Sequence, residues 1–437
     1  MKIKFLYFIL LFLFTACGFA GKKNLQKTAY LYQQKIAKAN ADYQIFHHTN
    51  TQSTLYCNIK SDELLPVFLA HEKQNKIKYA ISGKLFSAQD ESIVIDSFAL
   101  QRDLLDTVKW IREAFIFSAN LHENYILKIT LKDLNKSTAI SKTIYFEKEL
   151  DSKENFQIFK SENRQYSNIF NTGDSLFIYH NSGKKNLSVR YFNNDFSVAS
   201  APFNLGELKV EKINPKATFT LTIDSNFFIL PVNQKGIYQI ITNETDEKGL
   251  NILAFENDFP TITTASDMIA PLQYISTKEE MQEISLAKNK KIVADQFWLR
   301  KAKNDKQIAK KLIKTYYKRV ENANRFFTSY KAGWKTDRGM IMIIFGAPNI
   351  IYQSKEGESW IYGEKNNMYA LNFTFTKIKN KFSDNDFQLN RSAYFKNIWN
   401  TAQTAWRDGH PYSDMDIKER IYEQERRQKQ NQFYIWY

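Results

Sequence analysis

Residues 41–258 show the short alternation of apolar and polar positions that is typical of β-strands. Between residues 41 and 150, strand-length runs rich in aliphatic and aromatic residues occur at 54–59, 78–86, 92–100, 114–119 and 125–131. Between residues 155 and 258, similar runs occur at 174–179, 187–192, 217–223, 226–232 and 236–242. Because polar turns separate these runs at regular spacing, the pattern predicts two successive β-sandwich domains of the immunoglobulin-like kind.

Helical spacing replaces this alternation in the last third of the chain. From Asp305 to Ser329, apolar side chains recur every three or four residues, with lysines on the opposite side; they are Ile308, Leu312, Tyr316, Val320, Ala323 and Phe327. The next apolar run, 340–345, has the length and composition of a strand. With further strands at 359–362 and 369–376, the pattern predicts a long helix packed on a small antiparallel sheet that the 340–345 run opens.

Local signals set the boundaries of this predicted α+β domain. Residues 259–275 contain two prolines and a threonine-rich run, which favours a linker. The domain itself spans residues 276–415, begins where Ser276 and Glu279 fit a capping box, and includes a second helix at 394–407. Residues 416–437 form a charged, helix-prone tail that ends in five apolar or amphipathic residues. This end either docks on its own domain or contacts a partner protein.

The N-terminus has the pattern of an export signal. Residues 1–16 combine a basic start, a short apolar core and a small-residue cleavage site, and the apolar run is shorter than the roughly 20 residues of a membrane-spanning helix. Cys17 follows Thr-Ala, as in a lipobox, which predicts a lipid (palmitate-type) attachment at Cys17. A plain secretory signal is the alternative interpretation. Residues 17–40 are predicted to be a tether with a short helix at 25–39.

Charge and cysteine content limit the partners of such a protein. The formal net charge is +15, and in an exported chain this surplus favours anionic headgroups or acidic protein surfaces, with no nucleic acid as partner. Apart from Cys17 there is one cysteine, Cys57, so acylation would leave no internal disulfide. Cys57 is predicted to be a small apolar residue of a β core. No acidic cluster follows Cys17, which favours the periplasmic face of the outer membrane.

A compact motif lies between the long helix and the apolar run. It consists of Gly333, Trp334, Thr336 and Asp337, followed by Arg338-Gly339. These residues resemble the signature of the GWxTD-domain family of exported proteins from Bacteroidota-type bacteria, as do Asn324 upstream and Arg391-Ser392 downstream. The resemblance covers about the last third of the chain and implies this family's architecture. It implies no reaction, because the family has no established activity to carry over.

Each motif residue has a structural and a functional interpretation. Turn chemistry explains Gly333, Gly339 and an Asp337 side chain that accepts backbone donors within its own turn, with Arg338 paired locally. Trp334 is predicted to anchor the core between helix and sheet, and Gly346 and Pro348 to end the apolar run. The functional interpretation makes these same residues a binding site for a ligand or partner.

The remaining candidates for chemistry are sparse. No two of the six histidines have the i, i+4 spacing of a helical zinc pair, so the sequence predicts neither a metal nor a cofactor. It contains no nucleophile elbow, phosphate-binding loop or dinucleotide fingerprint. His410 is the best acid-base candidate, although a loop histidine after a helix is usually solvated.

These observations predict a lipid-anchored envelope protein that acts as a non-catalytic scaffold in an outer-membrane assembly. One alternative is an envelope enzyme on glycans or peptides, with a site that uses Asp337, Arg338 or His410. A second alternative is carbohydrate binding by the sandwiches, which requires exposed, coplanar aromatic rings.

Overall fold

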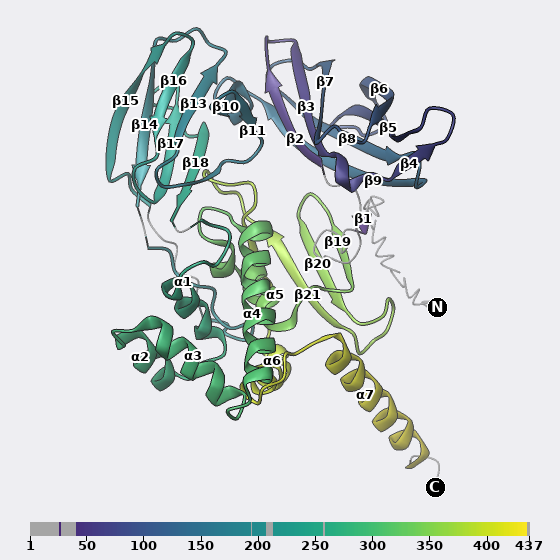
Figure 1. Ribbon diagram of the computed structural model, residues 1–437, viewed down its shortest axis with the longest axis vertical. Helices are drawn as coiled ribbons and strands as arrows, with labels where there is room; N and C mark the ends of the chain where they lie inside the picture. The colour runs from purple at the N-terminus through teal and green to yellow at the C-terminus, as the bar shows by residue number, and fades with distance from the viewer. Residues whose placement is uncertain (1–25, 28–40, 194, 207–212, 257, 435–437) are drawn as a thin grey trace, which may run out of the picture.

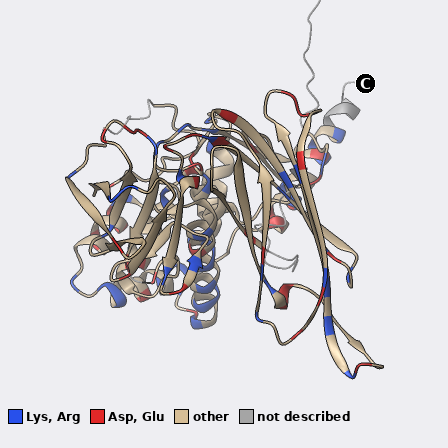
Figure 2. Ribbon diagram, turned by 90° about the horizontal axis from the view of Figure 1, so that it is seen from above, with Lys and Arg blue, Asp and Glu red and all other residues tan. Residues whose placement is uncertain are grey.

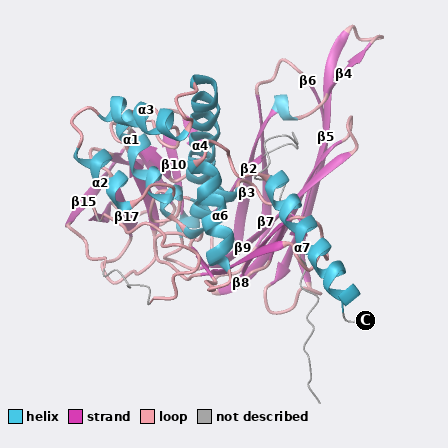
Figure 3. Ribbon diagram, turned by 90° about the horizontal axis from the view of Figure 1, so that it is seen from below, coloured by secondary structure: helices cyan, strands magenta, loops and turns pink. Residues whose placement is uncertain are grey.

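The computed structural model describes residues 26–27, 41–193, 195–206, 213–256 and 258–434 (Figure 1). The fold is mixed. Mostly antiparallel sheets form the N-terminal half, and the seven α-helices of the described residues all follow residue 264. Figure 3 shows this separation, with the helices gathered beside the sheets of the second block and a single long helix at the C-terminal end.

Residues 41–148 form a first block of two sheets. One sheet has the order β2-β3-β7, and the other has the order β4-β5-β8-β9 with β6 also paired to β5. Alternate side chains of both sheets face a shared core that includes Cys57, which is fully buried as predicted. The strands are β2 Ala41–His47, β3 Gln52–Lys60, β4 Pro66–Leu69, β5 Gln74–Ser87, β6 Val94–Leu105, β7 Trp110–Ser118, β8 Glu123–Asp133 and β9 Thr138–Lys148. All five predicted strand runs of this block coincide with strands.

Residues 156–255 form a second block with its own core. Its nine strands hydrogen-bond in the order β11-β10-β13-β16-β15-β14-β17-β18-β12, and inward side chains from both halves of this sheet meet in the core. The block is therefore sandwich-like. Its strands are β10 Phe156–Lys160, β11 Asn163–Gln165, β12 Ile169–Asn171, β13 Ser175–His180, β14 Asn186–Phe192, β15 Ala217–Asp224, β16 Phe227–Pro231, β17 Gly236–Ile241 and β18 Leu250–Phe255.

The C-terminal region surrounds the largest core of the described chain. Its helices are α1 Ala265–Ile269, α2 Lys278–Leu286, α3 Lys290–Lys301, α4 Lys306–Phe327, α5 Asp337–Phe345, α6 Phe395–Arg407 and α7 Asp414–Tyr434. Helix α4 is the predicted long helix, and five of its six predicted core residues are buried. The sixth, Ile308, is 40% exposed.

A five-stranded antiparallel sheet completes this region, in the order β1-β19-β20-β21-β22. The strands are β1 Gln26–Lys27, β19 Ile350–Gln353, β20 Gly357–Tyr362, β21 Leu371–Lys377 and β22 Phe387–Leu389. Helix α5 contacts α4, and its Phe345 packs against Tyr362 and Phe373 of the sheet and Trp399 of α6. The sheet therefore sits beside α5, and α4 reaches it through Phe327, whose ring lies 5.2 Å from that of Trp360.

The predicted strand at 340–345 is wrong, because these residues form helix α5. All nine residues of α5 are buried, and Thr336 caps it by accepting a hydrogen bond from the backbone N–H of Gly339 (3.1 Å). A helix that is covered on every side shows no amphipathic period. A short apolar run of this kind has the same pattern as a buried strand.

Three smaller expectations also need correction. The predicted linker at 259–275 is not extended, since it forms α1 and a 3-10 turn (Ala270–Tyr274) in which Leu272 and Tyr274 are buried. The capping box of α2 uses Thr277 and Glu280, one residue later than predicted. In the predicted helix 25–39, the two described residues, 26 and 27, form strand β1, and the others lie outside the described residues.

The blocks and the C-terminal region contact one another directly. Phe192, Phe196, Ile237 and Leu253 of the second block pack with Phe382 in a small shared core. In the view of Figure 2, positions of both charge signs are interspersed along the strands and helices that it shows. Among the described residues, no helix combines the length with the apolar character needed to cross a bilayer.

Candidate functional site

The motif between α4 and α5 lies where three backbone segments touch. Residues Gly333–Lys335 form a single 3-10 turn that packs on the side of α4. A Cβ atom at Gly333 would lie 1.9 Å from the carbonyl oxygen of Ala323, and one at Gly339 would lie 1.9 Å from the carbonyl oxygen of Gly333. Both positions therefore require glycine, because backbone atoms of another segment occupy the space that a side chain would need.

Side chains from α4 and from the segment after α1 hold this turn in place. The Trp334 N–H donates to Asn324 Oδ1 (3.1 Å), and the Gly333 N–H donates to Thr328 Oγ1 (3.0 Å). The Tyr274 hydroxyl donates to the Trp334 carbonyl (2.9 Å), and burial raises the pKa of Tyr274. Trp334 itself is 9% exposed and belongs to the core, in agreement with its predicted role as a core anchor.

Asp337 is the first residue of α5, and its carboxylate is fully engaged. Oδ2 accepts the backbone N–H of Leu389 (2.8 Å) and Arg391 Nη1 (3.1 Å), and Oδ1 accepts Arg391 Nη2 (2.5 Å). The prediction that Asp337 accepts backbone donors within its own turn is wrong, because its backbone donor is Leu389 of β22. The local capping role belongs to Thr336 instead. A carboxylate in the first turn of a helix is also favourably placed in the helix dipole.

Arg338 is 2% exposed and pairs with residues that are distant in sequence. Nη1 donates to Glu358 Oε1 (3.1 Å), and Nη2 donates to the carbonyl (3.0 Å) and side-chain oxygens of Asn385. Its guanidinium lies 3.8 Å from the ring centre of Phe387 and 5.0 Å from that of Phe327. The predicted local pairing of Arg338 is wrong, because Glu358 is on β20, in the sheet.

Glu358 accepts three hydrogen bonds from side chains inside the protein. Its Oε1 also accepts Gln353 Nε2 (2.8 Å), and its Oε2 accepts the indole N–H of Trp360 (2.8 Å). The side chains of Arg338 and Glu358 are each 3% exposed. Two buried ion pairs thus tie α5 to β20 and to the segment around β22, and both motif charges are neutralised inside the protein.

Gly346 and Pro348 end α5 and lead into the sheet. Gly346 has φ +82°, and a Cβ atom there would lie 3.0 Å from Arg319 Nη2. Its carbonyl accepts the hydroxyl of Tyr362 (2.8 Å), and Pro348 is buried two residues before β19 begins. These residues stop a helix rather than the predicted strand.

The comparisons with known proteins agree with the position of this motif. Residues 236–408 match the GWxTD domain. The match begins in β17 of the second block, upstream of the predicted start at residue 276, and ends at the residue after α6. A comparison with curated proteins finds no match.

Solved structures resemble the chain only distantly. A red sea bream transglutaminase is 9% identical with a TM-score of 0.18, and the match covers 51% of this chain and 32% of the transglutaminase. CBD12 from CALX1.2 is 9% identical, with a TM-score of 0.16 and coverage of 58% and 93%. The protein pT26-6p is 7% identical, with a TM-score of 0.15 and coverage of 70% and 89%. The chain thus spans about a third of the transglutaminase.

The other predicted site residues lie apart from the GWxTD motif. Cys17 lies outside the described residues. His410 follows α6, its ring nitrogen Nε2 lies 2.5 Å from Asp416 Oδ1, and its side chain is 57% exposed. Asp337, Arg338 and His410 therefore have different partners. In the described part of the chain, no three metal-ligating side chains come together.

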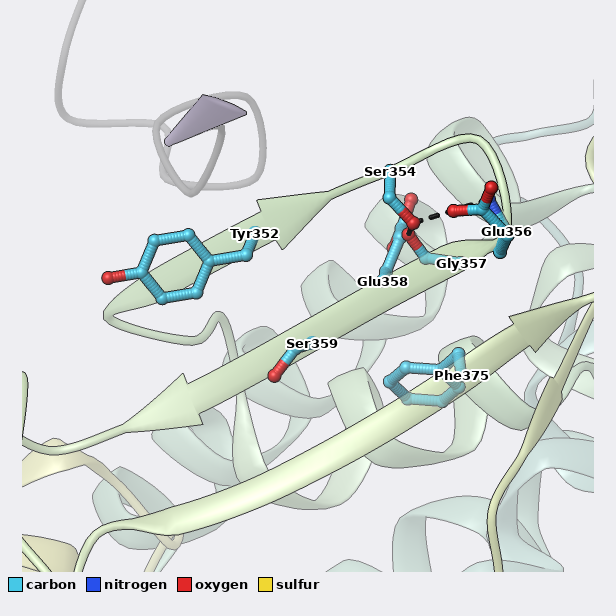
Figure 4. Close-up of a pocket in the computed structure, with 7 residues that line it drawn as sticks. All are labelled: Tyr352, Ser354, Glu356, Gly357, Glu358, Ser359 and Phe375. Atoms are coloured by element: carbon cyan, nitrogen blue, oxygen red, sulfur yellow. Dashed lines mark hydrogen bonds between the residues drawn. The ribbon is translucent and has the colours of Figure 1, made fainter. Parts of the chain in front are cut away.

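A shallow depression of about 200 Å³ lies on the sheet beside the GWxTD motif (Figure 4). Residues Tyr352, Ser354, Glu356, Gly357, Glu358, Ser359 and Phe375 line it. It contains neither motif charge, and the one motif partner in its wall, Glu358, is already hydrogen-bonded on both oxygens. The accessible surface of this depression is mostly apolar, although serine and glutamate side chains lie in its wall.

Sequence reasoning assigned no role to Arg391, Glu358 or Asn324, which hold the GWxTD motif together. Arg391 and Asn324 carry the family resemblance, but nothing in their neighbourhood identifies a partner 54 or 10 residues away. One signal for Glu358 exists. It occupies the inward position of β20 in line with Trp360 and Tyr362, and a charge at an inward strand position requires a buried partner.

Proposed function

We propose that this chain is a lipid-anchored cell-envelope protein in which the C-terminal region that contains the GWxTD motif, called the GWxTD region below, is a non-catalytic scaffold. The observation that carries the proposal is the state of the two motif charges. Asp337 and Arg338 are buried and each is paired with an oppositely charged side chain, so their geometry serves the shape of the region. A reaction centre, by contrast, keeps a reactive group open to substrate.

The proposal extends to the setting of the protein. Cys17 is the acylated residue of a Bacteroidota-type lipoprotein, and the protein sits on the periplasmic face of the outer membrane without crossing it. The two strand-rich blocks are immunoglobulin-like sandwiches that act as rigid spacers, and a protein of the envelope is the partner. More than one acyl chain gives stable attachment, whereas one chain alone binds marginally.

Fixed contacts between the units support a rigid scaffold. Lys335, inside the motif, donates to Asp195 Oδ1 (2.9 Å) and to the carbonyl of Phe196 (3.1 Å) in the second block. Its own carbonyl accepts the backbone N–H of Ala199 (2.9 Å). Lys248 of the second block pairs with Glu147 of the first (2.8 Å). The GWxTD motif is therefore part of the joint between the C-terminal region and the second block.

The alternatives have less support. An enzyme that uses Asp337, Arg338 and His410 would need these groups at one opening, and they have separate partners. Sugar binding requires coplanar exposed rings, but on the outer face of the second block Phe159 and Phe177 lie at 77° and 85° to Phe227. Perpendicular rings of this kind offer no flat stacking platform.

The test uses the full-length protein from membranes solubilised in mild detergent. Chemical crosslinking followed by mass spectrometry should give a reproducible adduct with another envelope protein, and the N-terminal peptide should carry acyl mass at Cys17. The Cys17→Ser variant should leave the membrane fraction and lose the adduct. A protein that stays monomeric under all crosslinking conditions, or that carries no acyl group, would refute the proposal.

A further inference from the structure

The first described segment of the chain pairs with the last sheet. Strand β1 is antiparallel to β19, with Gln26 opposite Gln353 and Lys27 opposite Tyr352. Without β1, strand β19 would be the open edge of the sheet, where unpaired N–H and C=O groups attract other strands. Figure 4 shows β1 next to Tyr352, at the border of the shallow depression. The N-terminal segment thus covers an edge of the GWxTD region, more than 300 residues away in sequence.

This pairing sets the length of chain between the anchor and the folded body. Nine peptide steps separate Cys17 from Gln26, because 26 − 17 = 9. An extended chain spans at most about 3.5 Å per residue, so this segment reaches about 30 Å. The first block begins at Ala41, which is 41 − 17 = 24 residues from Cys17 and would allow about 80 Å if β1 were not docked.

We infer that the GWxTD region, although last in sequence, is the part of the protein held against the membrane. The inference rests on the proposed acylation of Cys17. Docking of β1 on β19 makes the sheet edge the attachment point, so the bilayer surface lies within about 30 Å of this edge. Figure 1 shows the second block on the other side of the C-terminal region from β1, so this block is directed away from the lipid, whereas the first block lies beside β1. The chain order alone suggests the reverse arrangement.

Engineered disulfides test the docking in the full-length lipoprotein. The pairs are Gln26→Cys with Gln353→Cys and Lys27→Cys with Tyr352→Cys, each in a Cys57→Ser background. Consecutive antiparallel pairs alternate between the two geometries, so one of the two is the closer, non-hydrogen-bonded kind. Mild oxidation in membranes should link at least one pair, as detected by peptide mass spectrometry.

The matched control combines Gln26→Cys with Asn372→Cys on β21, which is exposed in the same sheet. Three strand spacings of about 4.8 Å already separate these positions by at least about 14 Å, and Asn372 is also offset along β21 from the residue in line with Gln26, so the pair is beyond the reach of a disulfide. No link in either test pair, or links as frequent as in the control, would overturn the inference. The acyl mass of the N-terminal peptide is read from the same sample. Acylated protein without a link refutes the docking alone, and linked protein without acylation refutes the membrane placement together with the proposed function.

Energy transfer to a lipid acceptor tests the orientation. A fluorophore on Asn372→Cys and one on Asn226→Cys, in the β15–β16 turn of the second block, are compared in vesicles that carry a headgroup-labelled lipid. Both variants lack Cys57, so each has one reactive thiol. We expect clearly stronger transfer from position 372. Equal transfer, or stronger transfer from position 226, would overturn the inference even if β1 is docked.

Discussion

Replacing Asp337 by alanine should destabilise the C-terminal region severely. The change removes a carboxylate that binds Arg391 through two parallel hydrogen bonds and also accepts the backbone N–H of Leu389. Arg391 would remain in place with a 7% exposed side chain. Its other acceptors are the carbonyls of Ser200 at 3.3 Å and of Leu389 at 3.5 Å.

The expected magnitude follows from this burial. The side chains of Asp337 and Arg391 are 10% and 7% exposed, so water cannot compensate the remaining guanidinium. Removing one partner of such a buried pair costs about 3–5 kcal/mol. The Leu389 N–H also loses its acceptor, but it belongs to the same hydrogen-bond network, so its cost does not add independently to that of the broken ion pair. We therefore expect a loss of about 3–5 kcal/mol in the free energy of unfolding of this region.

Tryptophan fluorescence during urea unfolding provides the assay. Five of the seven tryptophans lie in the core of the C-terminal region, so their signal reports its transition within a chain of several units; they are Trp298, Trp334, Trp360, Trp399 and Trp406. The control is Glu423→Ala, which breaks an ion pair with Arg427 whose side chains are 50% and 73% exposed. An exposed pair of this kind contributes about 0–1 kcal/mol.

A double-mutant cycle with Arg391→Met separates the pair from its surroundings. We expect the double variant to be more stable than the sum of the single losses predicts, because it leaves no unpaired buried charge. The reasoning is refuted if Asp337→Ala loses no more stability than Glu423→Ala. It is also refuted if the effects of the two changes in the pair are simply additive.

Three further predictions concern the rest of the chain. Gly333→Ala should lower the melting temperature of the C-terminal region by several degrees, because its Cβ would meet the backbone of α4 at 1.9 Å, whereas Gly206→Ala, with no contact under 3.2 Å, should have little effect. Burial lowers the pKa of His47 to about 3 and that of His180 to about 4, so below pH 6.5 the unfolded chain binds more protons than the folded chain. The free energy of unfolding should therefore fall between pH 6.5 and 4, by up to about 1.4 kcal/mol per pH unit for each histidine. His47→Gln should flatten this pH dependence in thermal melts, and an unchanged slope would contradict the role of His47. Burial raises the pKa of the Cys57 thiol to about 12, so a thiol reagent should label Cys57 only after unfolding. Labelling of the folded protein as fast as that of an exposed thiol would contradict the burial of Cys57.

The run at 340–345 shows where reasoning from the sequence reaches its limit. Six consecutive apolar residues between glycine-containing turns fit a buried strand and a buried helix equally well. The choice depends on what surrounds the run. Here α4, α6 and the sheet cover α5 on all sides, so its backbone satisfies its hydrogen bonds internally and every side chain finds apolar neighbours.

The partners of the GWxTD motif show a related limit. The sequence predicts a turn at the two glycines, but it does not predict the Thr336 cap, because the run after the turn is expected to be a strand and forms helix α5. The ion-pair partners of Asp337 and Arg338 lie 54 and 20 residues further along the chain. Many acidic and basic residues are available at such separations, and no local pattern selects one pair among them.

The sequence by itself determined five strands of each N-terminal block, the long helix α4 and the burial of Cys57, because each depends on a local period or on the apolar character of a short segment. The tertiary structure alone decided that α5 is a helix, that both charges of the GWxTD motif are buried and paired, and that β1 closes the edge of β19. These features depend on contacts between segments that are distant in sequence, and no local pattern specifies which of these segments pack together.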